Sequence, residues 1–199
     1  VHLGGSPEDV AAARPQVDRL IRALPGGGEA GPVAWDLFPH TGPEALVIPS
    51  PVNFVGMATS LDMSGPTAHY SHFVARRLLN NDYLWERVRM RGGAYGCSST
   101  LNHLDGRFLL TSYRDPHIDQ TLDLYRGAGA WLSGLELDNG ALEQAKIGTL
   151  GKMDPPERPS SMVSKSFIRD LIGLTYERRL SYWEQILETR LEHIHHFRS

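Results

Sequence analysis

An arginine and a tyrosine six residues apart are the side chains of this sequence best suited to chemistry. Arg89 and Tyr95 lie on either side of Gly92-Gly93, where an amphipathic helix is expected to end and a strand to begin. A guanidinium group and a phenol can together hold a peptide carbonyl oxygen and the negative charge that develops on it. The competing interpretation is a solvated basic turn at a helix C-terminus, formed by Arg87, Arg89 and Arg91.

The histidines near the C-terminus do not form a zinc-binding pattern. A catalytic zinc ion needs three converging protein ligands. Among His193, His195 and His196 only His193 and His196 are spaced by about one helical turn, and no His-x-x-Glu-His motif accompanies them. The segment that ends at His193 resembles an inverted zinc motif, but threonine stands where the first histidine belongs. We interpret Thr189 and Glu192 instead as a capping box, in which each side chain bonds a backbone donor of the other.

The other histidines and the lone cysteine are given structural roles. His69 and His72 are expected to flank a helical stripe in solvent, because no third ligand stands near them in the sequence. His103 and His117 stand beside turn residues and are expected at the surface. Cys97 is interpreted as a small buried residue, since no neighbouring base would lower its pKa. The sequence therefore predicts a chain with no metal site and no catalytic residue of its own.

The composition indicates a folded protein without a strong charge preference. A chain of 199 residues that is 41% hydrophobic can bury a core, and its net charge of -3 leaves no basic field for nucleic acid or an anionic membrane. One cysteine excludes an internal disulfide and favours a reducing compartment. Neither a secretory signal nor an apolar run of membrane-spanning length is present. We expect an intracellular location, either a bacterial cytoplasm or an organelle matrix, with no nucleic-acid or membrane partner.

A helix and a linker precede the segment that carries Arg89 and Tyr95. Ser6-Pro7 followed by two acids is typical of a helix N-terminus, and the glycine- and proline-rich stretch after Leu24 is typical of a linker. The sequence begins and ends without the usual punctuation of a complete domain, so we expect a fragment of a larger protein.

The elements around the arginine and the tyrosine are short. Residues 45–48 and 52–57 are apolar or alternating runs, which predict two strands. Apolar side chains at spacings of three and four over residues 70–78 predict a helix with one buried stripe. The polar run 80–82 is expected to interrupt this helix, and a second short helix is expected to end at Gly92-Gly93.

A hairpin is predicted after this second helix. Asp105-Gly106 is typical of a two-residue turn, because such turns need positive φ at both central positions. The turn would join strands 94–104 and 107–114 and place Ser98 opposite Tyr113. The rest of the chain is mostly helical in pattern. Strands first, a hairpin midway and helices last predict an α+β fold, an antiparallel sheet with helices packed on one face.

Four segments of the sequence together resemble one peptidase family. They are Asn53-Phe54-Val55-Gly56, Leu84-Trp85-Glu86-Arg87-Val88-Arg89, Gly92-Gly93-Ala94-Tyr95-Gly96 and Ser112-Tyr113-Arg114-Asp115-Pro116. These segments are similar to the C-terminal region of the presequence protease family, within the pitrilysin and insulinase group of zinc peptidases. The similarity extends from about residue 44 to 188.

The resemblance implies a place for this chain within a larger enzyme. Residues 44–199 would be the C-terminal α+β domain, of the type found in pitrilysin and mitochondrial processing peptidase, without the zinc motif. Residues 1–43 would be the helix and linker of the preceding domain. Four such domains, paired into two halves, would close around a chamber, and the N-terminal half of the same polypeptide would hold the zinc ion outside this chain.

The resemblance also implies a function. The chain would be the C-terminal, substrate-binding part of a zinc metalloendopeptidase that degrades targeting peptides and other short unstructured peptides. Arg89 and Tyr95 would hold the substrate and stabilise its oxyanion, with Arg87 as the competing arginine. Two alternatives remain open, a non-catalytic structural or assembly homologue of the same fold and a stand-alone ligand-binding α+β protein.

Overall fold

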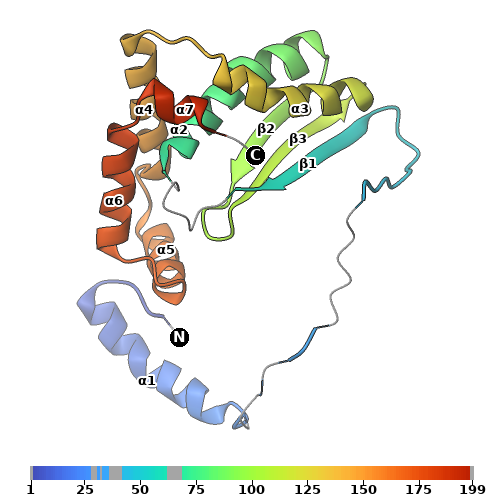
Figure 1. The fold of residues 1–199 in the computed structure, drawn as a ribbon. Coiled ribbons are helices and arrows are strands. Elements are labelled where there is room, and N and C mark those ends of the chain that lie inside the picture. Colours follow the sequence, from blue (N-terminus) through green and yellow to red (C-terminus); the bar gives the residue numbers. More distant parts are fainter. Residues whose placement is uncertain (1, 28–30, 32, 36–41, 62–68, 198–199) are drawn as a thin grey trace. The chain divides into compact units, whose positions relative to one another are not determined.

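The computed structural model describes residues 2–27, 31, 33–35, 42–61 and 69–197. The chain divides into two units. One comprises Val1–Ile48 and Pro156–Thr175, and the other comprises Pro49–Pro155 and Tyr176–Ser199. The candidate site lies in the second unit, whose sheet and helices are shown in Figure 1. The division predicted at residue 43 stays a prediction.

The first unit contains helices α1 (Pro7–Ala23) and α5 (Pro159–Leu171). The predicted start of α1 is confirmed, since the Ser6 hydroxyl accepts a hydrogen bond from the Asp9 backbone N–H at 3.1 Å. The helix buries none of its residues. Near its start the His2 ring lies 5.4 Å from the ring of Phe167 on α5.

The predicted strand at residues 45–48 is wrong. This segment is extended but has no strand partner among the described residues, and Leu46 and Val47 are 89% and 91% exposed. An apolar run becomes a strand only where a neighbour completes its hydrogen bonds, and the adjacent Pro49 and Pro51 have no backbone donor to offer one. The sheet begins instead at β1 (Asn53–Ser60), which covers most of the second predicted strand.

The second unit is built on a three-stranded antiparallel sheet. Its described strands are β1, β2 (Gly96–Leu101) and β3 (Arg107–Asp115), in the order β1-β3-β2. Val55, Phe108 and Leu110 are buried on one face, while the residues that alternate with them are more exposed. This second side is called the open face below. The alternation follows from the two-residue period of a strand, which sends successive side chains to opposite faces.

Helices cover the buried face of the sheet, as the sequence predicted. The remaining described helices of this unit are α2 (Ser71–Leu78), η1 (Leu79–Arg91), α3 (Asp119–Ser133), α4 (Asn139–Met153), α6 (Tyr176–Leu187) and α7 (Leu191–His195). The helix η1 packs on β2 and α3 packs on β1, while α2 contacts α4, α6 and α7 (Figure 1). The α+β prediction with helices on one face of an antiparallel sheet is thus confirmed.

The predicted interruption at residues 80–82 is wrong. The α2 helix passes directly into η1, a π-helix of 13 residues, a rare conformation that is often associated with functional sites. The Asn80 carboxamide oxygen accepts from the Ser99 backbone N–H at 2.6 Å and from the Ser99 hydroxyl at 3.1 Å. Asn80 therefore bonds the outer edge of β2 and does not end the helix.

The hairpin exists, but its predicted register is wrong. Five residues, Asn102 to Gly106, connect β2 to β3, and only Gly106 has a positive φ, of 71°. The Asn102 side chain accepts from the Leu104 backbone N–H at 3.0 Å, and this local bond stabilises a wider loop than a two-residue turn. The longer loop shifts the pairing by two residues, so Gly96, and not Ser98, lies opposite Tyr113.

Candidate functional site

The junction that carries Tyr95 is formed by the end of η1. Gly92 begins the reversal, and a Cβ atom there would lie 2.5 Å from the Val88 carbonyl oxygen, so only glycine fits. Gly93 follows with a φ of 81° and donates to the Arg89 carbonyl at 3.0 Å. The predicted helix end at these glycines is confirmed. After Ala94 comes Tyr95, which is 61% exposed and precedes the first residue of β2.

Arg89 lies on the last turns of η1 and stacks on an indole. Its guanidinium carbon is 3.9 Å from the centre of the Trp85 ring. Among the described residues no carboxylate lies within ion-pairing distance of Arg89, in contrast to Arg91, which pairs with Glu86 at 2.7 Å. The stack leaves the hydrogen-bond donors of Arg89 available, because a cation bound to a ring face does not use its N–H groups.

Arg89 and Tyr95 line the same hollow. Its volume is about 310 Å³, and it is bordered by Trp85, Arg89, Tyr95, Gly96, Cys97, Ser98 and Tyr113. Arg87, the competing arginine, does not border it. The Arg87 guanidinium carbon lies instead over the Tyr83 ring, 4.7 Å from its centre. The folded chain therefore brings two of the three predicted residues together at one end of the open face.

Tyr113 also borders the hollow, although no role was predicted for it. Its ring lies edge-to-face against Tyr95, with 5.4 Å between the ring centroids. The only signal in the sequence was its place in the Ser112–Pro116 segment, and the predicted register put Ser98 opposite it. Only the observed register, with Gly96 as its partner, places the ring beside Tyr95.

A bulge at Arg114 orients this end of β3. The register between β1 and β3 passes from Phe54 opposite Tyr113 to Asn53 opposite Asp115, so Arg114 is the extra residue. It has a φ of 48°, the one positive value among the described non-glycine residues. Its carbonyl accepts from the Tyr95 backbone N–H at 3.3 Å, and its guanidinium carbon lies 5.5 Å from the centre of the Tyr95 ring. The bulge thus supports Tyr95 from both backbone and side chain.

Hydrogen bonds of the buried Asp115 side chain stabilise the bulge. Its buried carboxylate accepts from the Ser112 hydroxyl at 2.5 Å, the Thr121 hydroxyl at 2.8 Å and the His117 backbone N–H at 2.9 Å. Without the extra residue, Asp115 and Tyr113 would share one face of β3. With it, the carboxylate points into the core while the phenol reaches the open face.

Cys97 lies at the floor of the hollow as a hydrogen-bonded thiol. It donates to the Leu84 carbonyl at 3.2 Å, and burial raises its pKa, an effect that the nearby Arg89 partly offsets. A raised thiol pKa disfavours the thiolate that a nucleophile needs. Cys97 packs against the core but is only half-buried, so the prediction of a buried cysteine holds in part.

The histidines differ in part from their predicted places. His69 and His72 are partly buried, not solvated, because His69 packs 4.5 Å from His193 and His72 lies edge-to-face on Phe197. Burial lowers the pKa of both, and that of His72 falls to about 4. His103 is also half-buried, next to the ring of Tyr182 at 5.9 Å, whereas His117 is exposed as predicted.

The predicted capping box at the C-terminal end is wrong. The Thr189 hydroxyl is buried and donates to the Gln185 carbonyl at 3.0 Å. The backbone N–H of Arg190 bonds the His193 ring at 3.2 Å instead. Over the described residues no group of three or more histidine, cysteine, aspartate or glutamate side chains is placed to hold a metal ion. The described part of the chain therefore offers no ligand set that fits zinc.

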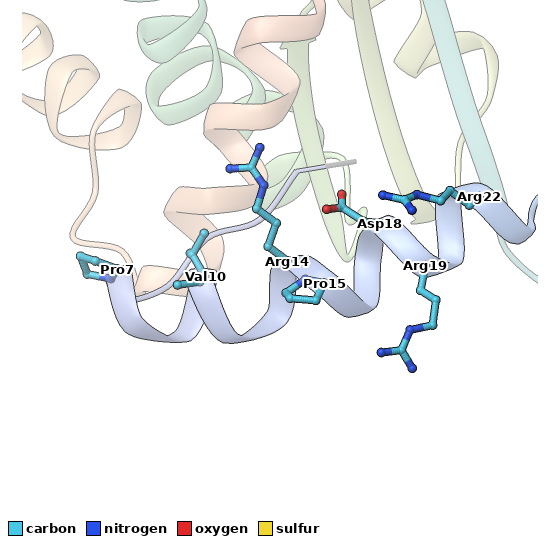
Figure 2. A pocket seen from close by; sticks show the side chains of 8 residues that line it. Pro7, Val10, Arg14, Pro15, Asp18, Arg19 and Arg22 are labelled. Carbon is cyan, nitrogen blue, oxygen red and sulfur yellow. The ribbon is translucent and has the colours of Figure 1, made fainter.

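A second hollow runs along α1 in the first unit. It has a volume of about 630 Å³, and all its lining residues, Pro7, Val10, Ala11, Arg14, Pro15, Asp18, Arg19 and Arg22, belong to this one helix. Figure 2 shows Arg14 and Arg22 on the same side of the helix as Asp18, while Arg19 extends from the opposite side. The hollow lies on the surface of α1 alone, and no second helix or strand contributes a residue to it. Within the described residues, no helix is long and apolar enough to cross a membrane.

The fold matches that of a solved peptidase domain. The crystal structure of the peptidase M16 inactive domain from Pseudomonas fluorescens superimposes with a TM-score of 0.57 and 17% sequence identity, over 74% of this chain and 37% of that one. At this identity the match shows the fold alone. It shows the class of fold, a pitrilysin-like α+β domain, to which the sheet and its helices belong.

The sequence match is more specific than the fold. Residues 43–199 match the family described as the PreP C-terminal domain, so the chain belongs to that family. Presequence protease 1, chloroplastic/mitochondrial, of Arabidopsis thaliana is 36% identical over 96% of the chain. Presequence protease, mitochondrial, of Mus musculus is 32% identical over 71% of it. The chain spans 18% and 13% of the lengths of these two relatives.

Proposed function

We propose that this chain is the C-terminal, peptide-binding part of a zinc metalloendopeptidase that degrades targeting peptides and other short unstructured peptides. The observation that carries the proposal is the shared hollow, which both Arg89 and Tyr95 border. The relatives are presequence proteases of mitochondria and chloroplasts, which supports the substrate class. They also favour an organelle matrix, although a bacterial cytoplasm suits the same chemistry.

The roles of the two residues follow from their donors. Arg89 offers a permanently charged fork of N–H groups, and Tyr95 offers a hydroxyl. Donors that are already oriented stabilise the negative charge that develops on a carbonyl oxygen, because they need no rearrangement during the reaction. The indole beneath Arg89 and the bulge beside Tyr95 fix the two donors before a peptide arrives.

The zinc ion of the proposed enzyme is held outside this chain. The described residues do not supply a ligand set, so we assign the metal to the N-terminal half of the same polypeptide. Zinc would supply Lewis-acid chemistry there. This chain contributes the binding and orientation of the peptide.

The test uses the complete polypeptide that contains this chain. Arg89→Lys and Tyr95→Phe are compared with the wild type for kcat and KM on a short unstructured peptide, and zinc content is measured in each preparation. We expect each variant to lower kcat by about 10²-fold, the usual loss of an oxyanion-stabilising donor, with zinc content unchanged. Arg107→Lys, at the far end of β3 where Arg107 pairs with Asp105, is the matched control.

Two results would contradict the proposal. Wild-type turnover in both variants would remove Arg89 and Tyr95 from the site. A wild-type polypeptide that binds no zinc and cleaves no unstructured peptide would favour the alternative, a non-catalytic structural or assembly homologue of the same fold.

A further inference from the structure

The Tyr113 ring is held in the hollow by the absence of a side chain at Gly96. The two residues are opposite each other in the β2–β3 register. A Cβ atom at residue 96 would lie 2.2 Å from Cε1 and 3.0 Å from the hydroxyl oxygen of Tyr113. The ring therefore lies directly over the backbone of β2, and any side chain at residue 96 would displace it. Glycine serves here for the close approach of a ring, since its φ is not positive.

The Tyr113 hydroxyl is available for a ligand. Neither it nor the Tyr95 hydroxyl has a hydrogen-bond partner among the residues that the structure describes, and Tyr113 is 44% exposed. The Tyr83 hydroxyl offers a contrast, because it donates to the Leu124 carbonyl at 2.7 Å. A tyrosine that only packs a sheet has no need to keep its polar end over a hollow lined by an arginine.

We infer that Tyr113 is a third substrate-binding residue of the proposed peptide site. This inference rests on the proposed function and adds a residue to it. A phenol both donates and accepts, so the Tyr113 hydroxyl suits the carbonyl or amide group of a peptide main chain next to the group held by Arg89 and Tyr95. Main-chain contacts do not depend on sequence, which fits an enzyme whose substrates vary in sequence. Gly96 is the positioning residue for this contact.

Two substitutions test the inference in the complete polypeptide. Tyr113→Phe removes only the hydroxyl, and Gly96→Ala displaces the whole ring. We expect Tyr113→Phe to raise KM for an unstructured peptide about 2- to 10-fold, the effect of one neutral hydrogen bond, with kcat within about 2-fold of wild type. Gly96→Ala is expected to raise KM at least as much.

The controls separate binding from folding. Gly56→Ala adds a methyl group on the same open face, but its nearest neighbours would be 3.9 Å away, so KM should stay at the wild-type value. Tyr176→Phe removes the hydroxyl of a more exposed tyrosine on α6, outside the hollow, and should also leave KM unchanged. Thermal unfolding of each variant shows whether the fold is kept.

The outcomes distinguish this inference from the proposed function. A wild-type KM in Tyr113→Phe overturns the inference, and if Tyr95→Phe is still impaired, the proposed function stands without it. Equal losses of kcat and thermal stability in Tyr113→Phe would show a structural role and also overturn the inference. If Gly96→Ala does not fold, Tyr113→Phe alone decides, because it removes one exposed oxygen atom. Unimpaired Arg89→Lys and Tyr95→Phe would remove the proposed function itself.

Discussion

The guanidinium carbon of Arg89 lies 3.9 Å from the centre of the Trp85 ring, and both side chains line one hollow. The two residues are four apart on the same helix, where side chains of neighbouring turns meet. Trp85 is 48% exposed, and the face of its ring binds the Arg89 guanidinium. The stack orients a charged group that has no carboxylate partner among the described residues.

Trp85 should therefore be needed for peptide binding. We predict that Trp85→Leu in the complete polypeptide lowers kcat/KM on an unstructured peptide about 3- to 10-fold, because a cation–π contact at a partly exposed site contributes about 1 kcal/mol. Trp85→Phe should retain part of the activity, since a smaller ring face remains. Arg87→Ala is the control and should behave as wild type. A larger loss in Arg87→Ala than in Trp85→Leu would reverse the choice between the two arginines.

Asp115 should be among the most sensitive positions of the second unit. Asp115→Ala leaves two buried hydroxyls and one backbone N–H without their acceptor, which should lower the free energy of unfolding by about 3 kcal/mol. Urea unfolding followed by circular dichroism measures the change. Asp123→Ala, which removes an exposed partner of Arg126 on α3, should stay within about 0.5 kcal/mol of wild type. Similar values for the two variants would contradict the anchoring role.

Two glycines that end or lie within helices should respond oppositely to alanine. Gly92→Ala would place a methyl group 2.5 Å from the Val88 carbonyl oxygen, so we predict a loss of about 2 kcal/mol in the free energy of unfolding. Gly151→Ala lies within α4 with no atom within 4 Å of the new methyl group. It should stabilise the chain by about 0.5 kcal/mol, since alanine favours a helix. Thermal melts of both variants provide the comparison, and a stable Gly92→Ala would show that the end of η1 adjusts freely.

His72 should make stability depend on pH in the acidic range. Burial, with a smaller contribution from His69, lowers its pKa from 6.5 to about 4 in the folded chain. The unfolded chain therefore takes up a proton below about pH 6.5 while the folded chain stays neutral, so stability decreases as the pH falls from 6.5 towards 4. We predict that the decrease between pH 7 and 4.5 is about 2 kcal/mol smaller in His72→Gln.

The pH dependence of His72→Gln also contains a contribution from the neighbouring His69. Burial and the charge of His193 also lower the pKa of His69, while Glu188 raises it, so a part of the decrease should remain in the His72 variant. His117→Gln, which replaces an exposed histidine, is the matched control. An identical pH profile in His72→Gln and wild type would mean that His72 is protonated in the folded chain.

Local patterns predicted those features that depend on local chemistry. The spacing of apolar residues in 70–78 predicted a buried stripe, and Phe73, Val74 and Leu78 are buried. Gly92-Gly93 predicted the end of a helix because glycine readily adopts a positive φ. The helix break predicted at Asn80 was wrong. The carboxamide of this residue disfavours a helix in isolation, but here it accepts a hydrogen bond from β2. The strand predicted at residues 45–48 was wrong for a related reason, since a strand needs a partner strand that the sequence does not show.

The sequence by itself determined the α+β class and the helix–glycine–strand junction, because each depends on residues close together in the chain. The tertiary structure alone decided that Arg89 and not Arg87 shares a hollow with Tyr95, and that Tyr113 joins them. The place of Tyr113 depends on the five-residue hairpin loop and the bulge at Arg114. One residue more in a strand reverses the face on which a side chain lies, and hydrogen bonds between distant segments determine where that residue is accommodated.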